Sequence, residues 1–235
     1  MQRFSLICIF IMVFSMSTSL CHSGQTDISK DIFLAENAWN LTERGKGVTH
    51  YSQSVKGSDL NAYKGVCLID SSIENVYAFL IDVSRHTSWI AYCSKSAVVE
   101  KNSDSDAIQY YDFDVPWPLS NRDIVVHCTT EVDSKTGAIT ISSSAVKDSV
   151  VPLKKDHLRI TDAKQKWVIE QIAPEKTRVT LYSLTHIKGP APKLLKKLVS
   201  HVIPSTSLKN LRLQAMKNTQ TSPSRYIAKT DAFVN

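Results

Sequence analysis

Alternating apolar and polar residues dominate the middle of the chain. Tyr111, Phe113 and Val115 alternate with polar or charged neighbours, and the same period of two runs from Ile124 to Val132. This period is typical of half-buried β-strands, because successive side chains of a strand point to opposite faces. The pattern predicts strands at about 48–56, 61–70, 95–101, 106–115, 121–133, 138–147, 156–162, 166–173 and 177–187.

Three other segments carry the apolar spacing of helices. They are predicted at about 31–44, at 72–82 after a serine cap, and at 191–217, where leucines and valines recur every three or four residues. Pro204 lies inside the last pattern, and a proline there lacks an amide donor and clashes with the preceding turn, so we expect a kink or a break. Many strands with helices at both ends and one between them indicate the α+β class.

A rigid break separates two of the predicted strands at Pro116-Trp117-Pro118. Both prolines fix their φ angles and cannot donate to a strand ladder, so the sheet must break there. Trp117 is held on a segment with little freedom, and we expect its ring to fill one fixed place. Arg122 and Asp123 follow, side by side in the sequence. Such a pair could select a polar group of a ligand, but more often it ties the loop to its neighbours.

The two ends of the chain are expected to lie outside the folded domain. Residues 1–23 have the pattern of a signal peptide: Arg3 is followed by an apolar run too short to span a bilayer, and small residues permit cleavage after Ser19 or Ser23. This segment predicts a secreted or periplasmic protein. A single domain is then expected at 24–218, followed by a flexible polar tail at 219–235.

Composition and charge exclude several classes of function. The chain has 235 residues, of which 43% are hydrophobic and 21% charged, with a formal net charge of +6. This balance permits attraction to anionic surfaces, but no basic run interleaved with aromatic residues predicts nucleic-acid binding. The histidines lack a metal-binding spacing and no nucleophile elbow is present, so we expect no metal, no cofactor and no catalytic centre. Cys67, Cys93 and Cys128 suggest no disulfide framework, and their pairing stays open.

The segment Pro-Trp-Pro-Leu-Ser-Asn-Arg-Asp-Ile-Val at 116–125 resembles the signature of the START (StAR-related lipid transfer) family. Further residues match in the same order over roughly residues 30 to 217: Trp39, Asp82, Trp89, Trp167, Pro192 and Pro204. The resemblance implies a helix-grip fold, in which a curved antiparallel β-sheet wraps around a long C-terminal α-helix and leaves an internal hydrophobic cavity. The segments 186–189 and 194–197 depart from the sequences usual in the family, so ligand specificity cannot be carried over.

The resemblance also implies a function. It predicts a monomeric, non-enzymatic carrier of a lipid, sterol or fatty-acyl molecule. The residues expected to bind this ligand are Phe113, Trp117, Arg122, Val126, Cys128, Ile141, Trp167, Leu195, Leu198, Val199 and Val202. Lys193, Lys196 and Lys197 fall on the other face of the last helix and could contact an anionic membrane.

Two alternatives stay open. The first is a polyketide cyclase that uses the same cavity, and the second is a lipid-sensing module without transfer activity. A cyclase needs several polar groups that converge in the cavity, whereas a carrier needs mostly apolar walls.

Overall fold

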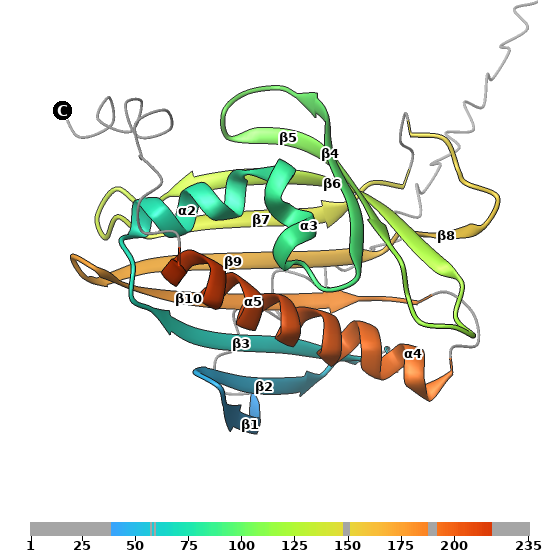
Figure 1. Ribbon diagram of the computed structural model, residues 1–235, viewed down its shortest axis with the longest axis horizontal. Coiled ribbons are helices and arrows are strands. Elements are labelled where there is room, and N and C mark those ends of the chain that lie inside the picture. The colour runs from blue at the N-terminus through green and yellow to red at the C-terminus, as the bar shows by residue number, and fades with distance from the viewer. Residues whose placement is uncertain (1–38, 57, 59, 148–150, 188–191, 218–235) are drawn as a thin grey trace, which may run out of the picture.

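The computed structural model describes residues 39–56, 58, 60–147, 151–187 and 192–217. The predicted signal peptide and the predicted tail both lie outside these residues. Figure 1 shows one curved sheet with a long C-terminal helix along its open side. The strands are β1 (Asn40–Gly45), β2 (Val48–Ser54), β3 (Asn61–Ile69), β4 (Cys93–Lys101), β5 (Asp106–Phe113), β6 (Asn121–Val132), β7 (Ile139–Ala145), β8 (His157–Ile160), β9 (Ala163–Ala173) and β10 (Lys176–Thr185).

The order of the strands makes the sheet a single curved surface. They follow β1-β2-β3-β10-β9-β7-β6-β5-β4, and every neighbouring pair on this path is antiparallel. The short strand β8 lies off the path and pairs in parallel with β6. Strands β2 to β10 lie at the predicted segments, with ends that differ by a few residues, and the predicted α+β helix-grip fold is confirmed.

The prediction of a helix at 31–44 is wrong for its last part. Residues Asn40–Gly45 form β1, which pairs with β2 at the edge of the sheet. Lys46 and Gly47 both adopt positive φ and form the tight turn between these strands. Pairing with β2 therefore overrides the helical spacing of the apolar residues, because backbone hydrogen bonds across the hairpin are worth more than a weak local preference. The earlier part of the predicted helix lies outside the described residues.

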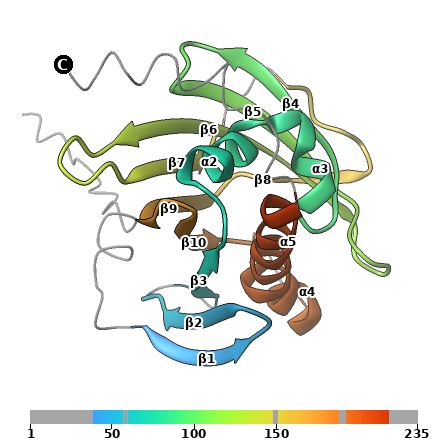
Figure 2. The same cartoon turned by 60° about the vertical axis from the view of Figure 1, so that its left-hand side comes forward.

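Three short helical segments connect β3 to β4. The helix α2 (Ile73–Ile81) begins at Ser72, whose hydroxyl accepts a hydrogen bond from the amide of Asn75, as the predicted serine cap requires. The turn η2 (Val83–Arg85) and the helix α3 (His86–Trp89) follow. Figure 2 shows these helices beside α5, on the same side of the sheet.

The C-terminal helix is continuous through Pro204. It consists of α4 (Lys193–Lys197), a π-helical turn η3 (Leu198–Val202) and α5 (Ile203–Lys217). The amide of Ile203 donates to the carbonyl of Leu198, five residues earlier, so the wider turn precedes the proline that lacks a donor. A π-turn is one of the ways in which a helix accommodates such an interruption. The prediction of a disturbance near Pro204 is confirmed as a π-turn rather than a break.

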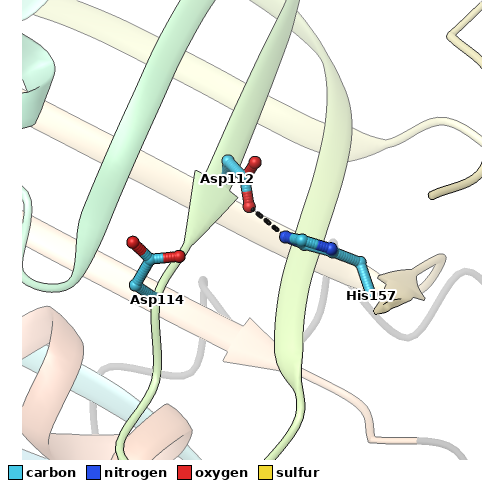
Figure 3. A group of neighbouring side chains, drawn as sticks. All are labelled: Asp112, Asp114 and His157. Carbon is cyan, nitrogen blue, oxygen red and sulfur yellow. Dashed lines mark ion pairs between the residues drawn. The ribbon is translucent and has the colours of Figure 1, made fainter. Parts of the chain in front are cut away.

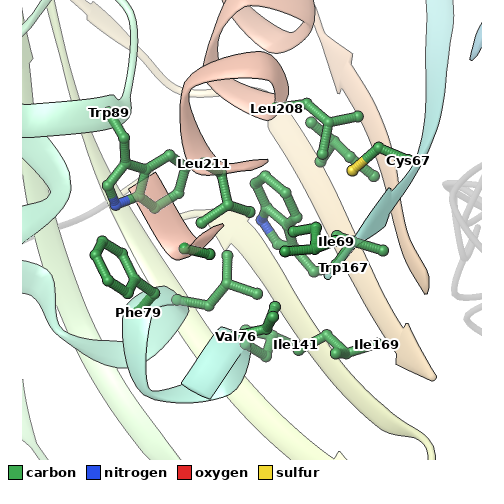
Figure 4. Close-up of a cluster of buried hydrophobic side chains, with 14 of the residues drawn as sticks. Cys67, Ile69, Val76, Phe79, Trp89, Ile141, Trp167, Ile169, Leu208 and Leu211 are labelled. Atoms are coloured by element: carbon green, nitrogen blue, oxygen red, sulfur yellow. The ribbon is translucent and has the colours of Figure 1, made fainter. Parts of the chain in front are cut away.

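Side chains fill one part of the space between the sheet and α5. Leu208 and Leu211 of the helix are fully buried against the sheet, and Trp89 meets Trp167 edge to face with ring centroids 5.9 Å apart. Figure 4 shows this cluster, which also contains Cys67, Ile69, Val76, Phe79, Ile141 and Ile169. This core fixes α5 on the sheet, and the remaining space lies toward η3 and the strands β5 to β7.

Candidate functional site

A cavity of about 470 Å³ lies between the concave face of the sheet and the helices. Its walls come from α2, α3, the strands β4 to β7, β9 and β10, and the C-terminal helix. Apolar side chains make up much of the surface, including Leu80, Val83, Trp89, Phe113, Val115, Ile124, Val126, Ile141, Trp167, Val199 and Ile203. A volume of this size is typical of a small-molecule site.

A row of polar side chains crosses the floor of this cavity. Cys128 pairs in register with Ser143, Ser143 with Gln165, and Gln165 with Ser183, so that these residues stand side by side on β6, β7, β9 and β10. Gln109 of β5 extends the row, because its side-chain oxygen lies 3.3 Å from the Cys128 sulfur. All five residues border the cavity. We call Gln109, Cys128, Ser143, Gln165 and Ser183 the polar band.

A buried tyrosine connects the polar band to α3. The hydroxyl of Tyr111 lies 2.6 Å from the side-chain oxygen of Gln109 and 2.8 Å from Nδ1 of His86. The other ring nitrogen of His86 donates to the carbonyl of Leu80 at 2.9 Å. Burial lowers the pKa of His86 to about 4 and raises the pKa of Cys128 to about 12. Both groups are therefore neutral near pH 7.

Arg122 and Asp123 do not pair with each other, because neighbouring residues of a strand point to opposite faces. Arg122 borders the cavity with 9% of its surface exposed, and its guanidinium donates to the carbonyl of Ser120. Burial lowers its pKa, and among the described residues no carboxylate forms an ion pair with it. Arg122 is thus a buried cation at the edge of an apolar cavity.

Asp123 instead binds Arg159 of β8 on the outer face of the sheet. The Nε and Nη2 atoms of Arg159 each lie 2.8 Å from a carboxylate oxygen of Asp123, and both side chains are buried. These hydrogen bonds raise the pKa of Arg159. The interpretation that Arg122 and Asp123 act as one pair is wrong, and the pair that secures this region is Asp123 with Arg159.

A second group of charges lies on the same outer face, away from the cavity. Figure 3 shows Asp112, Asp114 and His157, whose ligand atoms lie within 4.8 Å of one another. The Nε2 atom of His157 is 2.8 Å from Asp112, which also binds Lys154. Burial alone lowers the pKa of His157, but Asp156 and Asp112 outweigh it and raise that pKa. Lys154 and His157 therefore already contact Asp112, and Asn121 donates to Asp114, so the group ties the start of β8 and the segment before it to β5.

The predicted ligand residues fall into three places. Seven of them border the cavity: Phe113, Arg122, Val126, Cys128, Ile141, Trp167 and Val199. Leu195, Leu198 and Val202 pack instead with Val115 and Leu119, so they hold the helix against the loop between β5 and β6. The prediction that these three side chains line the cavity is wrong, because the helix presents Val199, Ile203, Pro204 and Ser207 to it.

Trp117 lies in the third place, at the surface. Its side chain is 90% exposed, so the prediction that it fills an internal position is wrong. The two prolines do end the strands, but they direct the loop outward, and Val115 and Leu119 supply the buried contacts. Trp117 consequently lies at the same end of the molecule as α4 and not in the cavity.

The sequence prediction missed most of the polar band and its link to α3. Ser143 stands within Ser142-Ser143-Ser144, where polar residues occupy both faces of the strand, so alternation gives no inward side. The period of two along each strand places three of these residues on the inward face, and this was the one available signal in the sequence. They are Gln109, Gln165 and Ser183. Only the register between strands brings them into one row.

Among the described residues, no helix is long and apolar enough to cross a membrane.

Comparisons with known proteins agree with this architecture. An uncharacterized protein of Pseudomonas aeruginosa is 32% identical over 185 residues, which cover 78% of this chain and 89% of that protein. The phosphatidylcholine transfer protein of Rattus norvegicus is 26% identical over 161 residues, 67% of this chain and 74% of that one. The crystal structure of a STAR-related lipid transfer protein from Xanthomonas axonopodis has a TM-score of 0.68 at 31% identity, over 76% of this chain and 99% of that chain.

A family match agrees with these individual similarities. The START domain family matches residues 23–221, which include every described strand and helix. The curved ten-stranded sheet with its long C-terminal helix is the architecture that this match implies. The chain therefore belongs to the START domain family.

Proposed function

We propose that this START domain is an exported carrier that holds one lipid in its internal cavity. The family and its lipid transfer relatives support lipid binding. The observation that carries the finer proposal is Arg122, a buried cation at the edge of an apolar cavity with no carboxylate partner among the described residues. A buried charge without a partner is costly, so an acidic group of a ligand has much to gain there.

The volume of the cavity indicates how much lipid it holds. Water-sized groups occupy roughly 30 Å³ each in a liquid, so the 470 Å³ of the cavity hold roughly 16 such groups. That is close to the size of one long acyl chain, and a lipid with two long chains would need the walls to separate. We therefore propose a ligand with a single chain or ring system and an acidic end at Arg122.

Burial of the ligand supplies enough free energy for binding. A ligand that buries about 400 Å² of apolar surface gains roughly 10 kcal/mol at about 25 cal/mol per Å². The loss of translational freedom and the ordering of the ligand offset several kcal/mol of this gain. The remainder corresponds to roughly micromolar affinity or better. Apolar burial thus decides whether a lipid binds, and Arg122 decides which end of it faces outward.

The end of the molecule near α4 is suited to contact with a membrane. Trp117 is 90% exposed on the loop between β5 and β6, and Leu194 of α4 is 57% exposed. This loop packs against α4 through Val115 and Leu119, so both apolar side chains project from neighbouring segments. Lys193, Lys196 and Lys197 lie on α4 together with Leu194. We call these five residues, Trp117, Leu194, Lys193, Lys196 and Lys197, the docking face.

Catalysis has weaker support than carriage. The polar band supplies converging polar groups of the kind that a cyclase needs, and a purely apolar pocket would supply none. This observation favours the cyclase hypothesis. However, burial raises the pKa of the Cys128 thiol to about 12 and raises the pKa of Tyr111 well above its ordinary value. Neither group forms the anion that a nucleophile requires near neutral pH. These neutral donors and acceptors suit recognition of a ligand better than covalent chemistry.

Binding of matched lipids tests the proposal. Lipid-free protein should bind stearic acid with a stoichiometry of one, and Arg122→Met should weaken this binding about tenfold or more, because a hydrogen bond to a charged group is lost. Binding of stearyl alcohol, which has no acidic group, should change little. Isothermal titration and native mass spectrometry measure both quantities. The proposal would be contradicted if the wild-type protein bound none of the three lipids stearic acid, stearyl alcohol and cholesterol.

A suitable control variant is Arg178→Met. Arg178 forms an exposed ion pair with Glu170 and does not border the cavity. This substitution removes one positive charge without touching the proposed site, so it should leave the affinity for stearic acid unchanged. A similar loss in both variants would mean that net charge, and not the position of Arg122, governs binding.

A further inference from the structure

We propose that the polar band is a second recognition site inside the cavity, which selects a lipid with a hydroxyl or carbonyl group partway along its chain. This inference rests on the proposed lipid binding and adds the chemical class of the ligand. A purely hydrocarbon chain needs no such row, and the apolar walls on both sides of it would serve that ligand better. The band therefore calls for a neutral hydrogen-bonding partner.

The band lies between two parts of the cavity, which we call its compartments, and apolar side chains border both of them. On the side toward α2 lie Ile141 and Trp167, each two residues from a member of the band on its own strand. On the side toward the loop between β5 and β6 lie Ile124 and Phe113. A ligand that spans both compartments must pass over the polar row, so a polar group at that level of the chain meets the band.

Several atoms of the band have hydrogen-bonding capacity left. Gln165 uses its side-chain oxygen to accept from Nε1 of Trp167 at 3.2 Å, and among the described residues its amide nitrogen has no partner. The hydroxyl of Ser183, which pairs in register with Gln165, likewise has no partner within the described part of the chain. These two groups lie side by side at the cavity wall. An alkyl chain laid against them leaves both without a hydrogen bond, at a cost that a hydroxyl or carbonyl removes.

The protons available in the hydrogen-bonded chain from His86 through Tyr111 to Gln109 indicate a further acceptor in the cavity. His86 donates through Nε2 to Leu80, so its neutral ring must accept at Nδ1 the single proton of the Tyr111 hydroxyl. That hydroxyl then has no proton left for Gln109, whose side chain lies 2.6 Å away. The contact is satisfied when the amide of Gln109 turns its nitrogen toward Tyr111, and the Cys128 sulfur, 3.3 Å from the same position, then accepts from that nitrogen as well. The carbonyl oxygen of Gln109 then takes the amide position that has no protein partner and accepts from a ligand.

The distance from Arg122 sets where the polar group of the ligand lies. Gln109 pairs in register with Val126, and Cys128 is a member of the band itself, so the band begins four and ends six residues after Arg122 along β6. Four to six residues of a strand span roughly 13–20 Å. With its acid group at Arg122, an extended fatty acid of eighteen carbons reaches the band in the half of its chain that lies away from the carboxylate. The chemical class that fits is a long-chain acid with a hydroxyl or keto group in that half of the chain.

Three fatty acids of equal chain length test the inference. They are stearic acid, 12-hydroxystearic acid, whose hydroxyl reaches the band, and 2-hydroxystearic acid, whose hydroxyl stays beside the carboxylate. Titration calorimetry should show that 12-hydroxystearic acid binds about fivefold tighter than the other two, the effect of one or two net hydrogen bonds. Equal affinity for all three acids would overturn the inference and leave the proposed carrier intact. Failure of all three to bind would overturn both.

Variants show whether the band causes this preference. Gln165→Met should abolish the fivefold preference and retain binding of stearic acid, and Ser183→Ala provides a second and smaller change should Gln165→Met fold poorly. Lys166→Met is the matched control, because Lys166 lies on the opposite face of β9 and does not border the cavity. A preference that persists in both Gln165→Met and Ser183→Ala would overturn the assignment of the site to the band.

Discussion

Individual residues owe their roles to the face on which the strand places them. Arg122 and Asp123 are neighbours in the sequence, yet one borders the cavity and the other is buried on the outer face with 1% of its side chain exposed. Each has a different electrostatic environment in consequence. Burial lowers the pKa of Arg122, whereas the hydrogen bonds of Asp123 raise the pKa of Arg159. The first residue is available for a ligand and the second is committed to the fold.

This difference predicts how stability responds to substitution. Asp123→Asn should lower the free energy of unfolding by about 3–5 kcal/mol, because it leaves the buried guanidinium of Arg159 without its charge partner. Urea denaturation followed by circular dichroism measures this change. The exposed pair of Arg178 and Glu170 is the control, and Glu170→Gln should cost less than about 1 kcal/mol. Equal effects of the two substitutions would contradict the structural role of Asp123.

At the scale of elements, the C-terminal helix consists of two parts with different packing. The part in α5 is held by fully buried Leu208 and Leu211 in the main core. The part in α4 and η3 packs through the smaller cluster with Val115 and Leu119 and through the ring of His201, which lies against His50 and Tyr63, and the π-turn η3 joins this part to α5. A π-turn has poorer hydrogen-bond geometry than an α-helical turn. We infer that the N-terminal part opens while α5 stays in place.

Hydrogen exchange tests this division within one helix. Amides of Lys193–Val202 should exchange at least about tenfold faster than those of Leu208–Ala215, because local opening costs less where fewer apolar contacts are broken. Mass spectrometry of peptides from the intact protein measures both rates in one experiment. The central strand β9 is the slow reference. Exchange of the N-terminal part that is no faster than that of β9 would contradict a gate at this end of the cavity.

At the scale of the whole molecule, the proposed docking face lies next to the cavity. The loop that carries Trp117 packs against α4, and Val115 of the same loop borders the cavity. A membrane that binds the docking face therefore meets the protein beside Arg122 and the N-terminal part of the last helix. In the proposed orientation, the acidic end of a lipid at Arg122 is the end nearest the proposed docking face.

Vesicle binding tests the docking face. Replacement of Lys193, Lys196 and Lys197 by Gln should weaken binding to vesicles that contain phosphatidylserine by about two orders of magnitude at low salt, since each lysine near such a surface contributes about 1 kcal/mol. Trp117→Ser should weaken binding to the same vesicles at high salt as well. Cosedimentation measures both effects. Leu213→Ser, at an exposed apolar residue of α5, is the control, and an equal loss in this variant would refute the assignment.

The sequence determined the local structure and the family. The period of two predicted β2 to β10, the serine cap predicted the start of α2, and the segment at 116–125 pointed to the START family. These features could be predicted because each depends on residues that are close in the chain, where backbone geometry and side-chain period act directly. The same local evidence failed at Asn40–Gly45, where pairing with the following strand overrides the helical spacing.

The tertiary structure alone decided which inward residues meet. The polar band exists because the register between strands aligns Cys128, Ser143, Gln165 and Ser183, and no spacing within one strand contains that information. The partner of Asp123 comes from β8, more than thirty residues later, and the exposure of Trp117 follows from the direction of its loop. Contacts between distant segments depend on how the whole chain packs, so the shape and chemistry of the cavity could be read only from the folded molecule.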